Sequence, residues 1–277
     1  MLELEGLLKT AIIAAIDAGK ATLQYYNTKL DVEKKSDDSP LTIADLKSNA
    51  IIEKQLKETN IPVLSEEGNY LSYAERKKWE LLWIVDPLDG TKEFIKKSDQ
   101  YTVNIALVKK NTPILGVVYA PAIDLLYYGI VGVGAYKIDG VSSVNLTAHV
   151  LDNSSCIKLP EYSTYNDLTI VASRSHLNPE TDKFIKKIGE IFGKTDILSI
   201  GSSLKLCMIA EGSAQIYPRL APTMEWDTAA SHAIVLASGA GIAIYPSFKD
   251  LTYNKENLLN PWFIVYSKDL YKSLIKM

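Results

Sequence analysis

Residues 81–94 read LLWIVDPLDGTKEF and lead from a buried strand into a turn that carries several charged groups. The apolar run 81–85 is continuous and has the length of a strand, which predicts a strand covered on both faces. Asp86 and Asp89 follow this run directly, and open α/β sheets bind ligands beyond the carboxyl ends of their strands. We therefore predict a ligand site at this end of the strand.

The turn itself is built from residues with special backbone properties. Pro87 stiffens the chain, and Gly90 allows a ligand to approach the backbone closely. From Thr91 onward the chain is expected to form a helix whose free N–H groups face an anion. The pattern D-x-x-D-G-T is only moderately specific, because Asp-Pro and Asp-Gly pairs also occur in ordinary turns. Spacing alone therefore leaves a plain turn as an alternative.

Two further acidic segments, SEEG at 65–68 and EWD at 225–227, accompany this turn. Carboxylates that lie close together repel one another unless a cation neutralises them. Hard oxygen ligands without His or Cys suit Mg²⁺ better than zinc. Two such ions, roughly 3.5–4 Å apart, could stabilise the attacking and leaving oxygens of a phosphoryl transfer.

The composition excludes several classes of protein. The chain has 277 residues, of which 47% are hydrophobic and 23% charged, which argues against disorder. Its 30 Lys and Arg against 33 Asp and Glu give a net charge of −3, which leaves no basic excess for nucleic-acid binding. Cys156 and Cys207 form no C-x-x-C pair, which excludes a disulfide scaffold or a zinc ribbon. The acidic N-terminus is unlike a secretory signal, and we expect a cytoplasmic protein with reduced thiols.

Two weakly charged stretches approach the length of a membrane span. Residues 228–248 change from a helical to a strand-like pattern at Gly239. Residues 111–136 are broken into β-type pieces by two prolines and a glycine. Neither stretch is expected to cross a membrane.

The pattern changes from α+β to α/β near residue 150, and we expect two halves, 1–150 and 151–277, that complete one site between them. Apolar residues at helical spacing predict helices over 4–26, 42–57, 179–192, 203–211 and 226–237. Thr42 with Asp45 matches a capping box. Apolar or alternating runs predict four strands between 101 and 138 and others at 62–64, 81–85, 168–173, 196–200, 214–218, 242–245 and 261–267.

The segments SEEG, WIVDPLDGTKEF and EWDTAASHA together resemble the lithium-sensitive, Mg²⁺-dependent phosphatase superfamily that includes inositol monophosphatase. DDSPLTIAD (37–45), ASRSH (172–176) and GSSLKLCMIAEGSAQIYPR (201–219) are similar to its bacterial branch of CysQ-type 3′(2′),5′-bisphosphate nucleotidases. The motifs follow in the expected order from about residue 36 to 263. The resemblance implies a layered α-β-α-β-α sandwich.

The resemblance also implies a metal site. Glu66 and Asp86 would bind a first ion together with the backbone carbonyl of Leu88. Asp86, Asp89 and Asp227 would hold a second ion. Two or three Mg²⁺ ions per site are implied.

Catalytic roles follow from the same resemblance. Asp45 and Thr91 would position and polarise a metal-activated water that attacks the phosphate. The backbone N–H groups of Gly90 and Thr91 would receive phosphate oxygens, and Asp227 would also contact the substrate. The transition state of phosphoryl transfer asks mainly for charge stabilisation and alignment, so this set is sufficient. Taken alone, Asp45 is more typical of a helix cap and Asp227 of an ordinary helix start.

A second phosphate on the substrate requires cations away from the metal ions. The family-like segments offer candidate groups in Arg174, His176, Ser202, Ser203, Lys205 and Arg219. Taken singly, Lys205 and Arg219 are equally consistent with surface charges.

Other polar residues near the motifs are expected to have ordinary roles. Asp37 and Asp38 are assigned to a solvated turn, and Glu67 is not counted as a ligand. His232 lies inside an apolar helix, which favours a hydrogen-bonded place in the core or behind the metal ligands. Cys207 has helical spacing with apolar neighbours and is assigned to the core.

We expect a Mg²⁺-dependent phosphatase that removes the 3′-phosphate of adenosine 3′,5′-bisphosphate to give AMP and phosphate. The family role is in sulfur metabolism, where this nucleotide is a by-product of sulfate activation, and lithium sensitivity is implied. The partner would be the nucleotide substrate, and the protein a monomer or homodimer. A broader inositol or sugar phosphatase is one alternative. A non-catalytic Mg²⁺- or nucleotide-binding protein is another, against which the complete set of motif residues argues.

Overall fold

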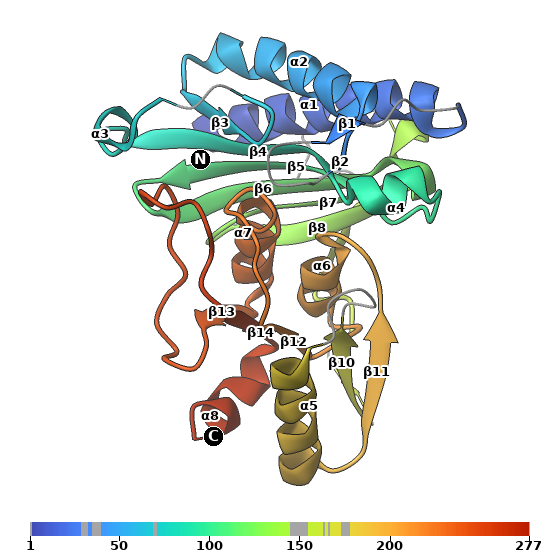
Figure 1. The fold of residues 1–277 in the computed structure, drawn as a ribbon, viewed down its shortest axis with the longest axis vertical. Coiled ribbons are helices and arrows are strands. Elements are labelled where there is room, and N and C mark those ends of the chain that lie inside the picture. Colours follow the sequence, from blue (N-terminus) through green and yellow to red (C-terminus); the bar gives the residue numbers. More distant parts are fainter. Residues whose placement is uncertain are drawn as a thin grey trace.

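Two large β-sheets and the helices packed on them form five stacked layers (Figure 1). The computed structural model describes residues 2–28, 33–34, 40–68, 71–144, 155–162, 164–165, 167–172 and 178–276. The layers are, in order, α1 (Leu2–Tyr26) with α2 (Ile43–Leu56), a seven-stranded sheet, α6 (Leu204–Glu211) with α7 (Ala229–Ser238), a five-stranded sheet, and α5 (Pro179–Phe192) with α8 (Tyr271–Leu274). The predicted α-β-α-β-α sandwich is thus confirmed.

The first layer follows directly from the apolar spacing of its helices. Leu8, Ile12 and Ala15 of α1 are buried against Trp83 and other residues of the seven-stranded sheet. α2 starts as predicted, because the Thr42 and Asp45 side chains satisfy backbone N–H groups at the helix start in a capping box.

The seven-stranded sheet has the strand order β3-β4-β5-β6-β7-β8-β9. The strands are β3 (Val63–Ser65), β4 (Leu81–Asp89), β5 (Thr102–Lys109), β6 (Thr112–Ala120), β7 (Leu125–Ile130), β8 (Gly134–Asp139) and β9 (Ile157–Leu159). β3 and β4 are parallel, and each later strand is antiparallel to its neighbour. The four strands predicted between 101 and 138 are confirmed, whereas β9 was not predicted. The division into halves at residue 150 stays a prediction.

β4 differs from its prediction in a way that matters for the site. It does not end at residue 85 but continues through Asp89, so Asp86 and Asp89 lie within the strand rather than after it. Pairing with β5 shifts register between these two aspartates, which accommodates Pro87 in an irregular segment. Asp86 lies opposite Asn104, and Asp89 opposite Thr102.

The five-stranded sheet has the order β11-β10-β12-β14-β13. Its strands match the predicted ones within one or two residues: β10 (Leu168–Ala172), β11 (Thr195–Ser199), β12 (Ile216–Arg219), β13 (Gly241–Ile244) and β14 (Phe263–Tyr266). Shorter elements complete the described chain: the pair β1 (Glu33–Lys34) and β2 (Pro40–Leu41), α3 (Tyr73–Arg76), α4 (Thr91–Ile95), and the 3₁₀ turns Lys57–Thr59, Pro121–Ile123, Val141–Ser143 and Lys268–Leu270.

The middle layer of α6 and α7 lies between the sheets. Cys207 of α6 is fully buried in the cluster that joins both sheets, which confirms its assignment to the core. His232 of α7 is also buried, and its Nδ1 lies 2.9 Å from the hydroxyl of Tyr253. Burial lowers the pKa of His232 to about 3, so it is a neutral core residue. None of the helices in the described part of the chain has both the length and the apolarity of a membrane span.

α7 approaches the seven-stranded sheet so closely that Gly116 of β6 has no room for a side chain. A Cβ atom at Gly116 would lie 2.0 Å from the carbonyl oxygen of Ala230. The added Cβ would be fixed rigidly to the strand backbone and the oxygen belongs to the helix backbone, so the contact could be relieved only by shifting the helix. Asp227 lies two residues before the start of α7, so this contact also helps to set the position of an expected metal ligand.

Gly116→Ala is expected to destabilise the protein by several kcal/mol, because α7 must move off the sheet. Chemical denaturation with Mg²⁺ removed measures this change. Gly6→Ala is the matched control. Gly6 lies in α1 with nothing within 4 Å of an added Cβ, so its substitution should be neutral or stabilise by up to about 1 kcal/mol. Equal stability of the two variants would contradict the close contact.

Candidate active site

Three carboxylates from distant parts of the sequence converge where β4 meets α6 and α7. Asp86 and Asp89 lie on β4, and Asp227 lies in the turn before α7. Each offers one oxygen, and these oxygens all lie within 4.8 Å of one another. The sequence named all three as metal ligands, and the structure brings them together.

Asp86 has a buried oxygen without a protein partner. Its Oδ1 accepts a hydrogen bond of 3.0 Å from the backbone N–H of Leu88. Its Oδ2 is buried, and no group of the described residues donates a hydrogen bond to it. Burial raises the pKa of Asp86 well above its usual range, and the negative charges of Glu66, Asp89 and Asp227 raise it further. An orphaned oxygen of this kind fits a metal ligand.

Asp227 is in a similar environment. Its Oδ2 accepts a hydrogen bond of 2.8 Å from the backbone N–H of Met224. Burial, followed by the charges of Asp89 and Glu66, raises the pKa of Asp227 to about 8. The cluster therefore holds its full negative charge near neutral pH only at a free-energy cost, which a divalent cation would remove. Oxygen donors with no His or Cys fit Mg²⁺.

Glu66 lies close to this cluster without belonging to the triad within 4.8 Å. Its charge raises the pKa of both Asp86 and Asp227, and its backbone N–H donates to the carbonyl of Val85 at 3.1 Å. Its role as a ligand of the first ion stays a prediction, as does that of the Leu88 carbonyl. That carbonyl lies 3.4 Å from the Thr91 hydroxyl.

Asp89 is fixed by the segment that leads into α6. Its Oδ2 accepts hydrogen bonds from the Ser203 backbone N–H (2.7 Å), the Ser203 hydroxyl (2.9 Å) and the Ser202 hydroxyl (2.5 Å). The Ser203 hydroxyl also lies 2.8 Å from the backbone carbonyl of Asp227. Ser203 was predicted to bind substrate, whereas here its side chain contacts two of the predicted metal ligands.

Asp45 combines the two roles that the sequence left open. Its Oδ2 caps α2 by accepting hydrogen bonds from the backbone N–H (2.8 Å) and hydroxyl (2.6 Å) of Thr42. Its Oδ1 accepts a hydrogen bond of 3.2 Å from the hydroxyl of Thr91. The two predicted catalytic residues are therefore in contact. Ser48, which the sequence did not single out, donates to the carbonyl of Pro87 at 2.6 Å and ties α2 to the turn.

Gly90 starts α4 in a conformation that favours glycine. Its φ of +90° lies in the left-handed region that other residues rarely adopt. α4 begins at Thr91, as predicted, and the chain turns at Gly90 directly beside Asp89.

Glu225, the first residue of the EWD motif, is fully buried and holds the loop behind Asp227. Its carboxylate accepts hydrogen bonds from the backbone N–H groups of Asn254 (2.5 Å) and Lys255 (2.9 Å). The Lys255 ammonium lies 2.6 Å away. Burial raises the pKa of Glu225, and Lys255 opposes this shift. Glu225 is therefore a structural carboxylate.

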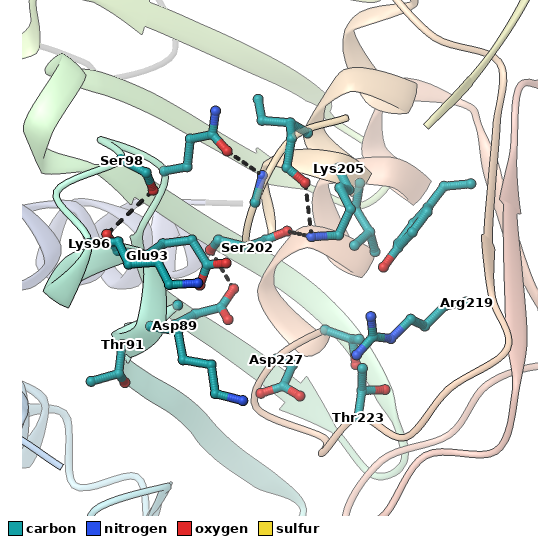
Figure 2. A pocket seen from close by; sticks show the side chains of 18 of the residues that line it. Asp89, Thr91, Glu93, Lys96, Ser98, Ser202, Lys205, Arg219, Thr223 and Asp227 are labelled. Carbon is teal, nitrogen blue, oxygen red and sulfur yellow. Dashed lines mark hydrogen bonds between the residues drawn. The ribbon is translucent and has the colours of Figure 1, made fainter. Parts of the chain in front are cut away.

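A cavity of about 500 Å³ opens beside the triad (Figure 2). Asp89, Thr91 and Asp227 line one side of it, and Lys205 and Arg219 line another. The sequence did not single out several other lining residues, among them Lys92, Glu93, Lys96, Gln100 and Tyr217. Lys92 and Glu93 belong to the quoted stretch 81–94 and Tyr217 to the quoted segment 201–219, whereas Lys96 and Gln100 lie outside the quoted motifs.

Lys205 is not a surface charge. The side chain is 7% exposed, and its ammonium donates to the carbonyls of Ser202 (2.7 Å) and Ile200 (3.4 Å). Burial lowers the pKa of Lys205 to about 8, opposed by the charge of Asp89 and reinforced by that of Arg219. A buried ammonium beside a second cation favours an anionic ligand.

Arg219 lies beside Lys205 at the same side of the cavity. Its Nη2 donates to the carbonyl of Pro222 at 2.9 Å. Its Nε is buried, and the described chain provides no acceptor for it. Arg174 and His176, the other predicted cations, and the predicted turn at Asp37 and Asp38 lie outside the described residues.

This site and the five-layer fold match a known family over nearly the whole chain. The model of the inositol monophosphatase family matches residues 3–271. The chain belongs to the inositol monophosphatase family.

Relatives within the inositol monophosphatase family point to one branch. The 3′(2′),5′-bisphosphate nucleotidase CysQ of Salmonella typhimurium is 41% identical over 264 residues, covering 94% of this chain and 99% of its own. CysQ of Escherichia coli K12 is 42% identical over 256 residues, covering 91% of this chain and 96% of its own. The crystal structure of CysQ from Bacteroides thetaiotaomicron superposes with a TM-score of 0.87 at 46% identity, covering 97% of this chain and 99% of its own. The Thermotoga maritima IMPase, with a TM-score of 0.74 at 21% identity, shares the fold.

Asp89→Asn is expected to lower phosphatase activity at least 100-fold and to abolish stabilisation by Mg²⁺. In the wild type, Mg²⁺ at 100 times its Kd should add about 2.7 kcal/mol to the free energy of unfolding. The asparagine oxygen can still accept from Ser203, so the melting temperature in EDTA should be unchanged or slightly higher. Thermal unfolding with Mg²⁺ and with EDTA measures both effects.

Glu80→Gln, at an exposed carboxylate before β4, is the matched control and should behave as wild type. Retained turnover or retained Mg²⁺ stabilisation in Asp89→Asn would refute the assignment of Asp89 to the metal site.

Proposed function

We propose that this protein is a Mg²⁺-dependent phosphatase that hydrolyses the 3′-phosphate of adenosine 3′,5′-bisphosphate to AMP and phosphate. The observation that carries the proposal is the cavity, which has Asp89 and Asp227 of the carboxylate triad on one side and the cations Lys205 and Arg219 on another. A metal site would take the scissile phosphate, and Lys205 with Arg219 would take the second phosphate. The relatives named bisphosphate nucleotidases support the same substrate class.

The metal-binding residues in this proposal are Glu66, Asp86, Asp89, Asp227 and the carbonyl of Leu88. When bound, Mg²⁺ supplies positive charge that stabilises the attacking and leaving oxygens of the transferred phosphoryl group. Removal of the ion leaves the triad with unbalanced charge, so activity is expected to depend fully on it.

Thr91 and Asp45 orient the attacking water in this proposal. The Thr91 hydroxyl donates its proton to Asp45 at 3.2 Å, which leaves the lone pairs of its oxygen to accept a hydrogen bond from water. A water held in this way presents its own lone pair to the phosphorus atom. The N–H groups of Gly90 and Thr91 are proposed to receive phosphate oxygens, because the turn at Gly90 places them beside Asp89.

Lys205 and Arg219 provide the specificity for a second phosphate. Both groups donate to backbone carbonyls, so each is held in place while keeping further N–H groups for an anion. A cytoplasmic location, a role in sulfur metabolism, lithium sensitivity, and a monomeric or homodimeric state stay predictions of the family resemblance.

The first test compares phosphate release from adenosine 3′,5′-bisphosphate and from inositol 1-phosphate. We expect kcat/KM to be at least 100-fold higher for the nucleotide, with activity lost in EDTA and reduced by Li⁺. Equal or reversed preference would support a broader inositol or sugar phosphatase instead. No turnover of either ester with Mg²⁺ present would favour a non-catalytic binding protein.

Lys205→Met keeps the buried stem of the side chain and removes its charge. It should lower kcat/KM for adenosine 3′,5′-bisphosphate about 10-fold or more, while 3′-AMP, which lacks the 5′-phosphate, should change less than about threefold. Lys110→Met, at an exposed position, is the matched control. Equal losses for both substrates would contradict a role in binding the second phosphate.

The pH dependence gives a second readout of the same residue. The ammonium of Lys205 is present below its pKa of about 8 and is lost above it, so kcat/KM for the bisphosphate should fall as pH rises through 8. Lys205→Arg keeps a charge at this position, and the fall should then move to higher pH.

A further inference from the structure

Two polar residues interrupt the apolar pattern of β5 directly opposite the metal ligands. Thr102 and Asn104 are buried, with relative exposures of 0% and 1%. In the strand register Thr102 lies opposite Asp89, and Asn104 opposite Asp86. Buried polar side chains in a strand need hydrogen-bond partners, and the partners of these two lead to Asp89.

Both residues reach Asp89 through Ser202 and Ser203. The Asn104 Nδ2 donates to the Ser203 hydroxyl at 2.9 Å. The Thr102 hydroxyl lies 2.6 Å from the Ser202 hydroxyl and 2.9 Å from Asn104 Oδ1, so it can give its proton to only one of them. Their own distances to Asp89 Oδ2 are 3.5 Å, which is too long for a strong direct bond.

The network places two donors on one oxygen of Asp89 and brings a third within reach of it. Oδ2 accepts from the Ser203 N–H and the Ser202 hydroxyl, and the Ser203 hydroxyl shares its single proton between Oδ2 (2.9 Å) and the backbone carbonyl of Asp227 (2.8 Å). Among the described residues no hydrogen bond reaches Oδ1 of Asp89. The carboxylate therefore has one oxygen bound to the protein and one left for a cation.

Ser202 is held in an unfavourable backbone conformation by this arrangement. Its φ is +55°, in the left-handed region, which is unfavourable for a residue other than glycine. Such strain persists where surrounding contacts enforce it, and the contacts here are the hydrogen bonds to Asp89 and Thr102.

We propose that Asn104 and Thr102 are positioning residues that hold Ser202 and Ser203 on Oδ2 of Asp89 and so make Asp89 a single-oxygen metal ligand. Loss of such supporting hydrogen bonds typically weakens metal binding 10–100-fold. The inference rests on the proposed Mg²⁺ site but is independent of which phosphate ester is hydrolysed. A purely structural role would lower stability without changing metal affinity.

The test is a titration with Mn²⁺ in the absence of substrate, in which the EPR signal of the free ion measures how much Mn²⁺ is bound. Asn104→Leu removes the amide at similar volume and should raise the Kd for Mn²⁺ about 10-fold or more. Thr102→Val removes only the hydroxyl and should raise it about threefold, whereas Thr102→Ser keeps the hydroxyl and should restore wild-type affinity.

Thr22→Val is the matched control. Thr22 is fully buried, and its hydroxyl bonds to that of Tyr101 at 3.0 Å, away from Asp89. This variant loses a buried hydroxyl as Thr102→Val does, and should lose stability without any change in the Kd for Mn²⁺.

Wild-type affinity in folded Asn104→Leu and Thr102→Val would overturn the proposal. If Asn104→Leu does not fold, the comparison of Thr102→Val with Thr102→Ser decides, and equal affinities again overturn it. Failure of the wild type to bind Mn²⁺ would instead refute the metal site itself, and the inference with it.

Discussion

Mutual repulsion among three clustered carboxylates is the constraint on which this site depends. Asp86, Asp89 and Asp227 bring oxygens within 4.8 Å of one another, with Asp86 buried and the other two partly exposed at the cavity. A polypeptide left to itself would separate these groups or protonate them. The surrounding structure prevents separation: β4 fixes two of the groups, the docking of α7 fixes the third, and the start of α6 holds Asp89. The folded protein therefore has a cluster of negative charge that a bound cation would stabilise.

The same repulsion fits a site whose carboxylates come from distant parts of the sequence. One strand, β4, supplies two of the carboxylates. A third carboxylate on the same strand would repel these two in the unfolded chain as well as in the folded protein. Asp227 arrives only when α7 packs between the sheets, so the acidic cluster is completed by folding. Lys205, which is buried, and Arg219, which is partly exposed, come from the segment before Asp227 and balance part of that charge across the cavity.

Local sequence patterns predicted much of the fold and of the site. The features that were missed depend on contacts between residues far apart in the sequence. The capping box at Thr42 and Asp45, the helix from Thr91 and the α7 stop at Gly239 depend on neighbouring residues, and all are present. The continuation of β4 past Pro87 was missed because proline normally ends a paired strand, and only pairing with β5 overrides that preference. The support of Asp89 by Asn104 was missed because the serines between them are about a hundred residues away in sequence. The cations at 174 and 176 stay predictions.

The contact between Gly116 and Ala230 has a consequence for how the site tolerates change. Most layers of a folded protein are spaced by side chains, whose rotamers and volumes vary from one sequence to another. Here helix backbone rests directly on strand backbone, and backbone has no rotamers. The distance from the sheet to α7, and with it the position of Asp227, is therefore set by a van der Waals contact between backbone atoms. Substitutions elsewhere in the core can alter packing without altering the gap into which a metal ion must fit.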